Sequence, residues 1–286
     1  MAIWGSTFVF TKMLLLNGLS PAQIFTFRFI IAYVLLLAVC HRQWLSDTWR
    51  DELVMLALGI TGGSLYFLAE NAAMLYTTAT NTSLIVCSCP LFAMLLVAVV
   101  YRQTEHISRL QALGSVVACL GMAVVVLNGR FVLHLSPVGD LLAFAACLCW
   151  AFYSLLMKVV VERYSTLFIT RKVFFYGLVT IVPYYFVFPD EASVFLPSVF
   201  LHFSYSVFLN LLFLGVVASM LCFLVWNWVI LKLGAVVTTN WVYFNPIVTI
   251  VFAWWLLHEQ ITVWFLFGTA LILVGMYLSD HKQESR

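Results

Sequence analysis

The residue in this sequence with the clearest chemical potential is a carboxylate inside an apolar segment. Glu70 lies within the run from Gly59 to Pro90, which otherwise reads as two apolar helices joined by a short polar turn. A charge at the centre of a bilayer costs about 2.5–3.5 kcal/mol on insertion scales, so such a group faces a cavity, pairs with a cation or is protonated. Two interpretations stay open at this point: a structural ion pair with Lys12 or Arg28, or binding of a substrate or a proton.

Two amides and several aromatic and hydroxyl side chains extend this set. Asn71 and Asn227 occupy equivalent positions in an internal repeat, where they could form interhelical hydrogen bonds or contact a substrate. The aromatic candidates have a second interpretation as packing or interfacial residues. The candidate substrate-binding residues are Glu70, Asn71, Tyr66, Trp4, Trp150, Tyr153, Asn227, Thr239, Asn240 and Tyr243, and Glu70 is also the candidate for proton coupling.

Two prolines lie in the middle of apolar segments. Pro90 and Pro246 each remove a backbone hydrogen bond and free the carbonyl four residues earlier, at Val86 and Val242. Both prolines are candidate hinges, although a fixed bend that only shapes the helix is the favoured interpretation.

The sequence contains no recognisable enzyme motif. His258-Glu259 is not followed by the second His of a zinc-binding HExxH motif, and no GxSxG motif or glycine-rich phosphate loop occurs. The seven cysteines all lie in apolar runs, so disulfides are not expected. Cysteines two positions apart on a helix point about 200° apart, which does not suit a shared metal. We therefore expect no catalytic residue, no metal and no cofactor.

The elements that must position these residues are membrane-spanning helices. Of the 286 residues, 9% are charged and 64% are hydrophobic, whereas about 25% of a soluble domain is charged. The apolar runs predict ten spanning helices, of which the first is short for a hydrocarbon core of about 30 Å. The predicted helices cover residues 1–16, 22–40, 53–75, 80–101, 109–127, 138–160, 168–188, 206–230, 235–256 and 262–279.

The small net charge of +2 and the scattered basic residues bear on the partners of the chain. They argue against binding of nucleic acid, because proteins that bind nucleic acid carry clustered basic residues. The partners expected are membrane lipid and a small-molecule substrate, and a homodimer is left open.

The chain carries an internal duplication. The segment 59–90 returns 156 positions later as 215–246, with glycine, asparagine and proline residues in register, and WGSTFVFTK near the N-terminus matches WAFYSLLMK in the second half. Because each half holds five helices, an odd number, the second half enters the membrane from the opposite side. The sequence thus predicts an all-α membrane protein with ten transmembrane helices in two inverted-topology repeats, residues 1–130 and 137–280, around a central cavity.

Basic residues are distributed unequally between the two sets of predicted loops. Ten lie on the side that holds the even-numbered loops and both termini, and one, Arg130, lies on the other side. By the positive-inside rule, both termini are expected in the cytoplasm, with the protein in the plasma (inner) membrane. The ten are Arg42, Arg50, Arg102, Arg109, Arg163, Arg171, Lys172, Lys232, Lys282 and Arg286.

These features together resemble EamA-type transporters of the drug/metabolite transporter superfamily. The resemblance rests on the WGSTFVFTK motif, the helix pair with its mid-helix proline, the Glu after it, the paired glycines of helices five and ten, and Gly139-Asp140 at the start of helix six. It covers roughly residues 1–279. It implies a ten-helix basket whose central cavity carries small metabolites, often outward.

The sequence therefore favours a multi-pass secondary transporter, an exporter of small metabolites that works by alternating access. One alternative is an intramembrane enzyme, which would need a nucleophile–base pair or a metal site at one depth. The other is a multispan scaffold or regulator, which would not need polar residues and kinks at matched depths in both halves.

Overall fold

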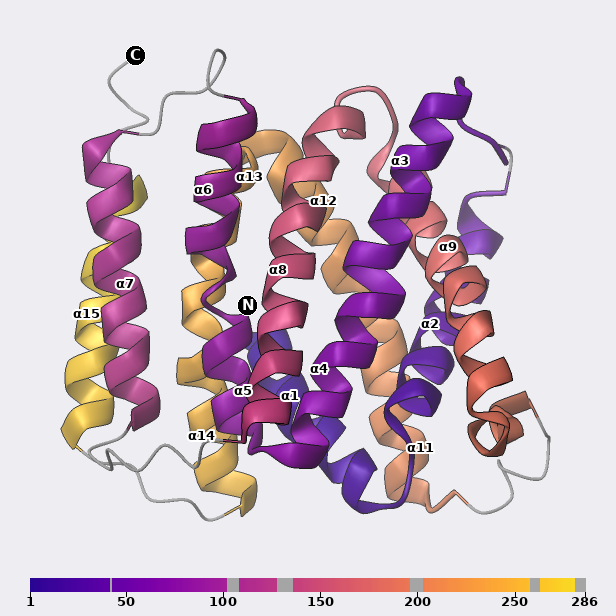
Figure 1. Ribbon diagram of the computed structural model, residues 1–286, viewed down its shortest axis with the longest axis horizontal. Helices are drawn as coiled ribbons and strands as arrows, with labels where there is room; N and C mark the ends of the chain where they lie inside the picture. The colour runs from indigo at the N-terminus through magenta and orange to yellow at the C-terminus, as the bar shows by residue number, and fades with distance from the viewer. Residues whose placement is uncertain (42, 102–107, 128–135, 196–202, 258–262, 281–286) are drawn as a thin grey trace.

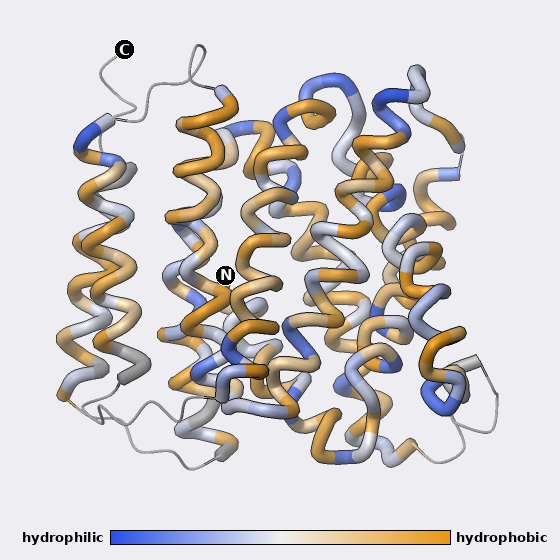
Figure 2. Tube along the Cα trace, viewed as in Figure 1, coloured by the Kyte–Doolittle hydropathy of each residue, from blue (hydrophilic) through white to orange (hydrophobic). Residues whose placement is uncertain are grey.

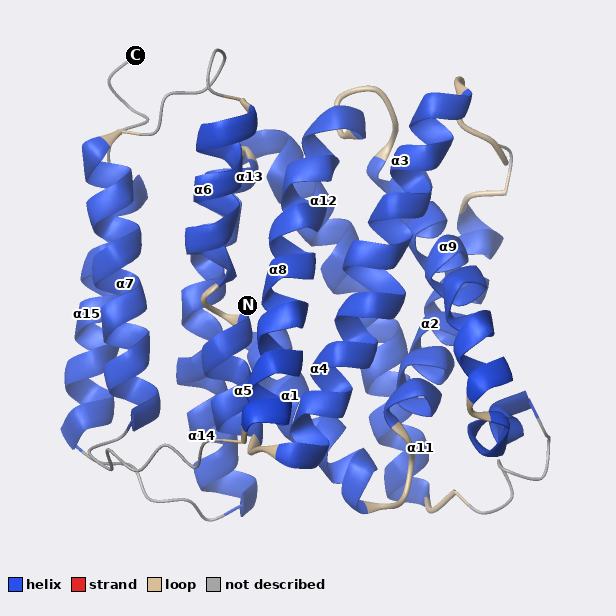
Figure 3. Cartoon of the chain, in the orientation of Figure 1, coloured by secondary structure: helices blue, strands red, loops and turns tan. Residues whose placement is uncertain are grey.

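A computed structural model describes residues 1–41, 43–101, 108–127, 136–195, 203–257 and 263–280. In this part of the chain, helices form ten rods and no strand occurs (Figure 3). The rods consist of α1 (Ala2–Leu16); α2 (Pro21–Val39); α3 (Trp49–Gly59), η1 (Ile60–Ser64) and α4 (Leu65–Tyr76); α5 (Ala79–Val86) and α6 (Cys89–Val100); α7 (Arg109–Leu127); α8 (Pro137–Val160); α9 (Thr166–Val187); α11 (Tyr205–Leu212), η3 (Phe213–Leu221) and α12 (Cys222–Leu233); α13 (Ala235–Asn240), η4 (Trp241–Phe244) and α14 (Asn245–Leu257); and α15 (Val263–Asp280), with a short 3-10 segment η2 (Pro189–Phe195) after α9.

Seven of these rods are long and apolar enough to cross a membrane by length and composition. The other three contain shorter apolar helices: Ala2–Leu16, Arg109–Val124 and Leu266–Leu278 within the described residues. Hydrophobic residues dominate the length of the rods, and many of the hydrophilic residues lie toward their upper and lower ends (Figure 2). The prediction of an all-helical, multi-pass membrane protein is confirmed: the described residues hold seven candidate spans and three shorter apolar helices.

Hydroxyl side chains fix where many of the helices begin. Each accepts a hydrogen bond from the backbone amide three residues later, which satisfies one of the free amides at a helix start. Ser20 forms a complete capping box with Gln23 before α2, and Thr48 caps α3, which therefore begins earlier than the predicted residue 53. The same bond is formed by Thr78, Ser136, Ser165 and Ser204, before α5, α8, α9 and α11.

Successive rods alternate in direction, so that corresponding helices of the two halves run oppositely. In Figure 1, α1 runs toward the lower edge and its counterpart α8 toward the upper edge. The packing partners also recur: α1 packs on α14, and α8 packs on α5 and α6, the equivalents of α13 and α14. Likewise, α2 packs on η3, and α9 packs on η1. Opposite direction and repeated partners are the features expected of an inverted repeat.

Helices α7 and α15 pack closely along the left side of Figure 1. A Cβ atom on Gly121 would lie 2.6 Å from the backbone nitrogen of Ile272, and one on Gly275 would lie 2.4 Å from that of Ala118. Both distances are too short for real atoms, so glycine is required at each position. Small residues that let two backbones approach closely are typical of helix pairs in membranes.

Four rods are interrupted at positions that correspond between the halves. The π-helical segments η1 and η3 overlap when one half is shifted by 156 positions, and Gly63 within η1 leaves helical geometry altogether, with φ −128° and ψ −107°. The α5–α6 rod breaks at Cys87 and Ser88, and the equivalent stretch of the other half is the 3-10 segment η4. The proline positions predicted these last two interruptions, whereas no sequence signal that we used predicted the π segments.

Candidate functional site

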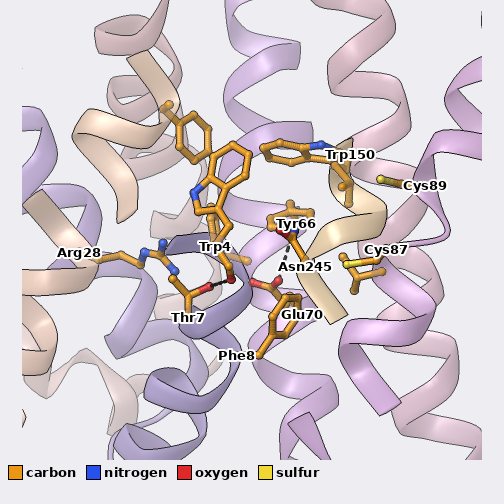
Figure 4. Close-up of a pocket in the computed structure, with 14 residues that line it drawn as sticks. Trp4, Thr7, Phe8, Arg28, Tyr66, Glu70, Cys87, Cys89, Trp150 and Asn245 are labelled. Carbon is orange, nitrogen blue, oxygen red and sulfur yellow. Dashed lines mark hydrogen bonds between the residues drawn. The ribbon is translucent and has the colours of Figure 1, made fainter. Parts of the chain in front are cut away.

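A small cavity lies between the two halves (Figure 4). It encloses about 30 Å³, room for one or two water molecules. The residues that line it come from α1, α2, α4, α5, the α5–α6 break, α6, α8, α12, η4 and α14. They are Trp4, Thr7, Phe8, Arg28, Tyr66, Phe67, Glu70, Val86, Cys87, Cys89, Trp150, Phe223, Val242 and Asn245.

Much of this lining consists of repeat-equivalent pairs, one residue from each half. Phe67 and Phe223, Val86 and Val242, and Cys89 and Asn245 are all 156 positions apart, and Trp4 and Trp150 are the matched tryptophans of the two opening motifs. The cavity therefore lies where equivalent parts of the two halves meet.

The two charged groups of the cavity, in contrast, both come from the first half. Glu70 on α4 is 5% exposed, and its Oε1 atom accepts a hydrogen bond of 2.8 Å from the Tyr66 hydroxyl one helical turn earlier. Among the described residues, no other group donates a hydrogen bond to this carboxylate and no cation forms an ion pair with it. One carboxylate oxygen is thus free of protein partners.

Arg28 on α2 is the second charge and is 1% exposed. Its Nε atom donates a hydrogen bond of 2.9 Å to the Ser219 hydroxyl in η3, and its guanidinium carbon lies 4.3 Å from the centre of the Phe67 ring. Figure 4 shows Arg28 and Glu70 entering the cavity region from different helices. In the described part of the chain, nothing accepts a hydrogen bond from either terminal guanidinium nitrogen.

Aromatic rings form the wall above these charges. Trp4 packs edge-on against Trp150 with ring centres 5.3 Å apart, and its indole nitrogen donates to the Ala218 carbonyl in η3 at 2.8 Å. Trp150 also packs against Tyr66 and stacks on Tyr153, with ring centres 5.0 Å and 5.1 Å apart. These contacts link both opening tryptophans to the other half of the molecule. Each of these tryptophans therefore contacts residues of both halves.

Lys12, the other cation considered as a partner of Glu70, lies at the end of α4. Its ammonium group donates to the carbonyls of Met74 at 2.5 Å and Thr77 at 3.4 Å. A cation at the C-terminal end of a helix is stabilised by the free carbonyls and the helix dipole. Neither Lys12 nor Arg28 forms the direct ion pair with Glu70 that one interpretation of the sequence required.

Of the predicted site residues, Glu70, Tyr66, Trp4 and Trp150 line the cavity, and the others are not among its lining residues. Asn71 and Asn227 are fully buried and connect helices: Asn71 donates to the Pro21 carbonyl at 3.1 Å, and Asn227 bonds Tyr153 at 2.7 Å and Thr170 at 2.9 Å. These bonds agree with the interpretation that both amides form interhelical hydrogen bonds.

The patch of Thr239, Asn240 and Tyr243 is also buried but lies outside the cavity lining. Thr239 bonds the Ala235 carbonyl within its own helix, and Asn240 accepts a hydrogen bond of 3.0 Å from Ser115. The Tyr243 hydroxyl has no hydrogen-bond partner among the described residues.

Both candidate hinge prolines occupy the first turn of the helix that follows an interruption. Pro90 is the second residue of α6, and Pro246 is the second residue of α14. A proline at this position loses no hydrogen bond, because the amides of a first helical turn have no partner within the helix. The sequence predicted a kink at each proline. The structure instead has a break in the helix before Pro90 and a 3-10 segment before Pro246.

Sequence reasoning considered Arg28 only as a partner of Glu70 and missed Asn245 as a lining residue. An arginine flanked by apolar residues inside a predicted span was the available signal for Arg28. Within the described residues, no group of three or more His, Cys, Asp or Glu side chains could hold a metal ion.

Ten alternating helical rods, two matched halves and a charged cavity between them define a multi-pass membrane protein of the inverted-repeat type. The model of the EamA-like transporter family matches residues 1–127 and 137–279. This chain belongs to the EamA-like transporter family.

Individual relatives are similar over part of their length. Two uncharacterized transporters of Archaeoglobus fulgidus are 26% and 28% identical over 181 and 188 residues, and the match spans 63% of each relative. The uncharacterized transporter YyaM of Bacillus subtilis is 26% identical over 189 residues, which is 59% of its length. One solved crystal structure shares the fold with a TM-score of 0.71 at 17% identity, covering 98% of this chain and 95% of that one.

Proposed function

We propose that this chain is a secondary transporter that exports small metabolites across the plasma membrane by alternating access. The observation that carries the proposal is the cavity itself: repeat-equivalent residues line it, and a buried carboxylate, Glu70, faces it with one oxygen that accepts no hydrogen bond from any described residue. A binding site at the interface of inverted repeats, near the middle of the membrane, is the arrangement that such transporters use. The name of the family and the names of the relatives agree with it.

In this proposal, the two five-helix units, residues 1–130 and 137–280, rock against each other around the cavity. The interruptions at η1 and η3, and at Cys87–Ser88 and η4, supply joints at equivalent depths in the two units. Helix breaks of this kind absorb a change in backbone angles without disturbing the rest of a rod. Pro90 and Pro246 keep each following helix rigid up to its joint.

The orientation follows from the basic residues. Described basic side chains gather where α3 and α9 begin and where α8 and α12 end, which is the upper side of Figure 1. We assign this side to the cytoplasm, together with both termini. No phosphate-binding loop occurs in the sequence, so the driving force is an ion or solute gradient, and Glu70 is the candidate for carrying a proton.

Transport in purified form tests the proposal. Metabolites that accumulate in cells lacking the protein and decline in cells that overproduce it would be offered to proteoliposomes containing the wild type, Glu70→Gln or Glu162→Gln. Glu162 is an exposed carboxylate after α8 and serves as the matched control. We expect flux with the wild type and Glu162→Gln and at least a tenfold loss with Glu70→Gln. A protein that inserts normally but moves none of these metabolites would instead be an enzyme or a scaffold.

A further inference from the structure

A second and larger hollow lies at the end of the molecule where α3 begins. It encloses about 350 Å³, against about 30 Å³ for the cavity between the halves. Its lining comes from the loop between α2 and α3, from residues 49–56 of α3, and from Tyr176 on α9. These segments lie at the upper right of Figure 1. We call this hollow the α3–α9 groove.

The loop residues of the α3–α9 groove are fixed through their backbone. The Ser46 amide donates to the Oε2 atom of Glu52 at 2.8 Å, and the Asp47 amide donates to the Tyr164 hydroxyl at 2.9 Å. The next residue, Thr48, caps the start of α3. The side chains of Ser46 and Asp47 therefore project from a backbone that is already held in place.

Two of these side chains nevertheless have no partner among the described residues. The Ser46 hydroxyl oxygen is buried without a hydrogen bond, and the exposed Asp47 carboxylate accepts none. Beside them, Glu52 accepts bonds from Lys172 and Tyr176 on one oxygen and from the Ser46 amide on the other, which leaves the second oxygen able to accept once more. A buried polar atom without a partner indicates a missing ligand or water. The groove thus offers three acceptors to a donor group.

The charges of the surrounding side chains leave one carboxylate in excess. Lys172 is paired with Glu52, and Arg163 is paired with Asp51. Asp47 has no such counterpart in the described part of the chain. A ligand with a cationic group is therefore complementary to the groove.

The other described arginines near the groove do not change this balance. Arg171 donates to the backbone carbonyls of Cys40 and Gln43, where α2 ends. Arg50 is exposed, does not line the groove, and forms no hydrogen bond or ion pair with a described residue. It is available to an anionic group placed just outside the groove.

The remaining wall is apolar and leads into the membrane. Trp49, Leu53 and Leu56 line the groove at the spacing of one helix face, and Trp49 and Leu53 are 71% and 47% exposed. They belong to the first turns of a candidate span, residues 49–76. A tryptophan at the end of a span lies at the membrane–water interface. The acidic end of the groove is therefore at the level of the lipid headgroups, and the apolar end is at the level of the acyl chains.

We propose that the α3–α9 groove binds a phospholipid with a primary ammonium headgroup, of the phosphatidylethanolamine class. The three N–H donors of the ammonium group match the three acceptors, and the Trp49 ring offers its face to the same charge. The phosphate lies toward Arg50, and an acyl chain follows the stripe formed by Leu53 and Leu56. A free amine would leave this stripe unused. Because α3 and α9 belong to different halves, the bound lipid stabilises the contact between the halves at this end.

Lipid binding to the purified, delipidated protein in detergent tests the headgroup requirement. Native mass spectrometry would count the bound lipids, and thermal unfolding would be followed with the same lipids, all with two oleoyl chains. Phosphatidylcholine keeps the cationic charge but has no N–H donor, N-acetyl phosphatidylethanolamine loses the charge, and phosphatidylglycerol is anionic. We expect one phosphatidylethanolamine to stay bound under conditions that remove the other three lipids, and it alone to raise the melting temperature. Free phosphoethanolamine, which has the headgroup without the chains, should give no shift at the same concentration.

Variants place the lipid in the groove. Asp47→Asn and Trp49→Leu should each weaken the binding of phosphatidylethanolamine by roughly fivefold. Both residues are exposed, so both variants should fold normally. Asp190→Asn removes an exposed carboxylate after α9, at the opposite end of that helix, and should bind the lipid as the wild type does.

Several results would overturn the lipid site. They are equal retention of any of the other three lipids, binding that persists in the Asp47→Asn/Trp49→Leu double variant, and an equal loss with Asp190→Asn. An equal melting-temperature shift with free phosphoethanolamine would assign the groove to a soluble amine instead of a lipid. None of these measurements depends on flux, so the lipid site and the transport function can each be contradicted without the other.

Discussion

Tyr66 donates its phenolic hydrogen to Glu70 at 2.8 Å, from one helical turn earlier on the same face of α4. Both side chains are more than nine-tenths buried, and Tyr66 also packs against Trp150 of the other half. The bond fixes one oxygen of the carboxylate and directs the other into the cavity. The chemistry of Glu70 therefore depends on a residue that also contacts the second half.

Tyr66→Phe should reduce transport without preventing insertion. The substitution keeps the ring and its packing but removes the only hydrogen bond that the described residues donate to Glu70. A hydrogen bond to a charged group is worth about 1.5–3 kcal/mol, so we expect flux to fall by roughly tenfold or more. Proteoliposome flux measures this. Tyr205→Phe, at an exposed position, is the control, and equal rates for the two variants would contradict a role of the bond in transport.

Lys172→Met should destabilise the end of the molecule assigned to the cytoplasm. Lys172 on α9 forms an ion pair with Glu52 on α3, and the exposed fractions of the two side chains are 4% and 20%. Removing one partner of a fully buried pair costs about 3–5 kcal/mol, and the partial exposure of Glu52 reduces this to roughly 2–3 kcal/mol. Thermal unfolding in detergent should show a lower midpoint, and adding Glu52→Gln should restore part of it.

The neighbouring ion pair provides the comparison for this prediction. Arg163 lies 2.8 Å from Asp51, but its side chain is 54% exposed. Pairs with one solvated partner contribute little, so Arg163→Met should lower the midpoint far less than Lys172→Met. Similar effects of the two substitutions would show that burial does not decide the stability of this cluster.

A reporter fused after Arg286 should be active only in its cytoplasmic form. The prediction follows from the ten-to-one distribution of basic residues between the two sets of loops. The direction of the first and last rods agrees with it, because α1 runs toward the lower edge of Figure 1 and α15 runs toward the upper edge. Accessibility of the reporter from outside the cell would refute the assigned orientation and the count of ten crossings.

Periodicity, composition and the internal repeat were sufficient to predict the helical membrane fold. They also identified Glu70, Tyr66, Trp4 and Trp150, which the structure brings together at the cavity. A lone charge and paired tryptophans stand out in an apolar sequence because lipid makes polar groups costly. These residues could be identified because polar groups are rare in segments that lie in hydrocarbon.

The same reasoning could not assign partners to the buried polar residues. Asn71 and Asn227, like Glu70, are polar residues inside apolar segments, yet their amides form hydrogen bonds with neighbouring helices. Whether a buried amide meets a cavity or another helix depends on how each helix is rotated in the packed structure, and residue spacing does not determine that rotation. The π segments were missed for a related reason, since Gly62 in η1 accommodates the Tyr153 ring, which lies 2.2 Å from where a Cβ atom would be.

The pH dependence of transport should be lost in Glu70→Gln. A proton and the cationic group of a solute would compete for the same free oxygen of Glu70, so a transmembrane pH gradient should drive solute movement in the wild type. The titratable and charged groups that share the cavity with Glu70 are Tyr66 from its own helix, Arg28 from α2, Cys87 from the α5–α6 break and Cys89 from α6. Glutamine keeps the shape of the side chain but cannot exchange a proton.

Solute accumulation would be measured in proteoliposomes with the pH gradient imposed in each direction and collapsed by an ionophore. We expect the wild type to accumulate solute only when the gradient is present, and Glu70→Gln to give the same low level under all three conditions. A Glu70→Gln variant with wild-type accumulation and an unchanged response to the gradient would show that coupling resides elsewhere.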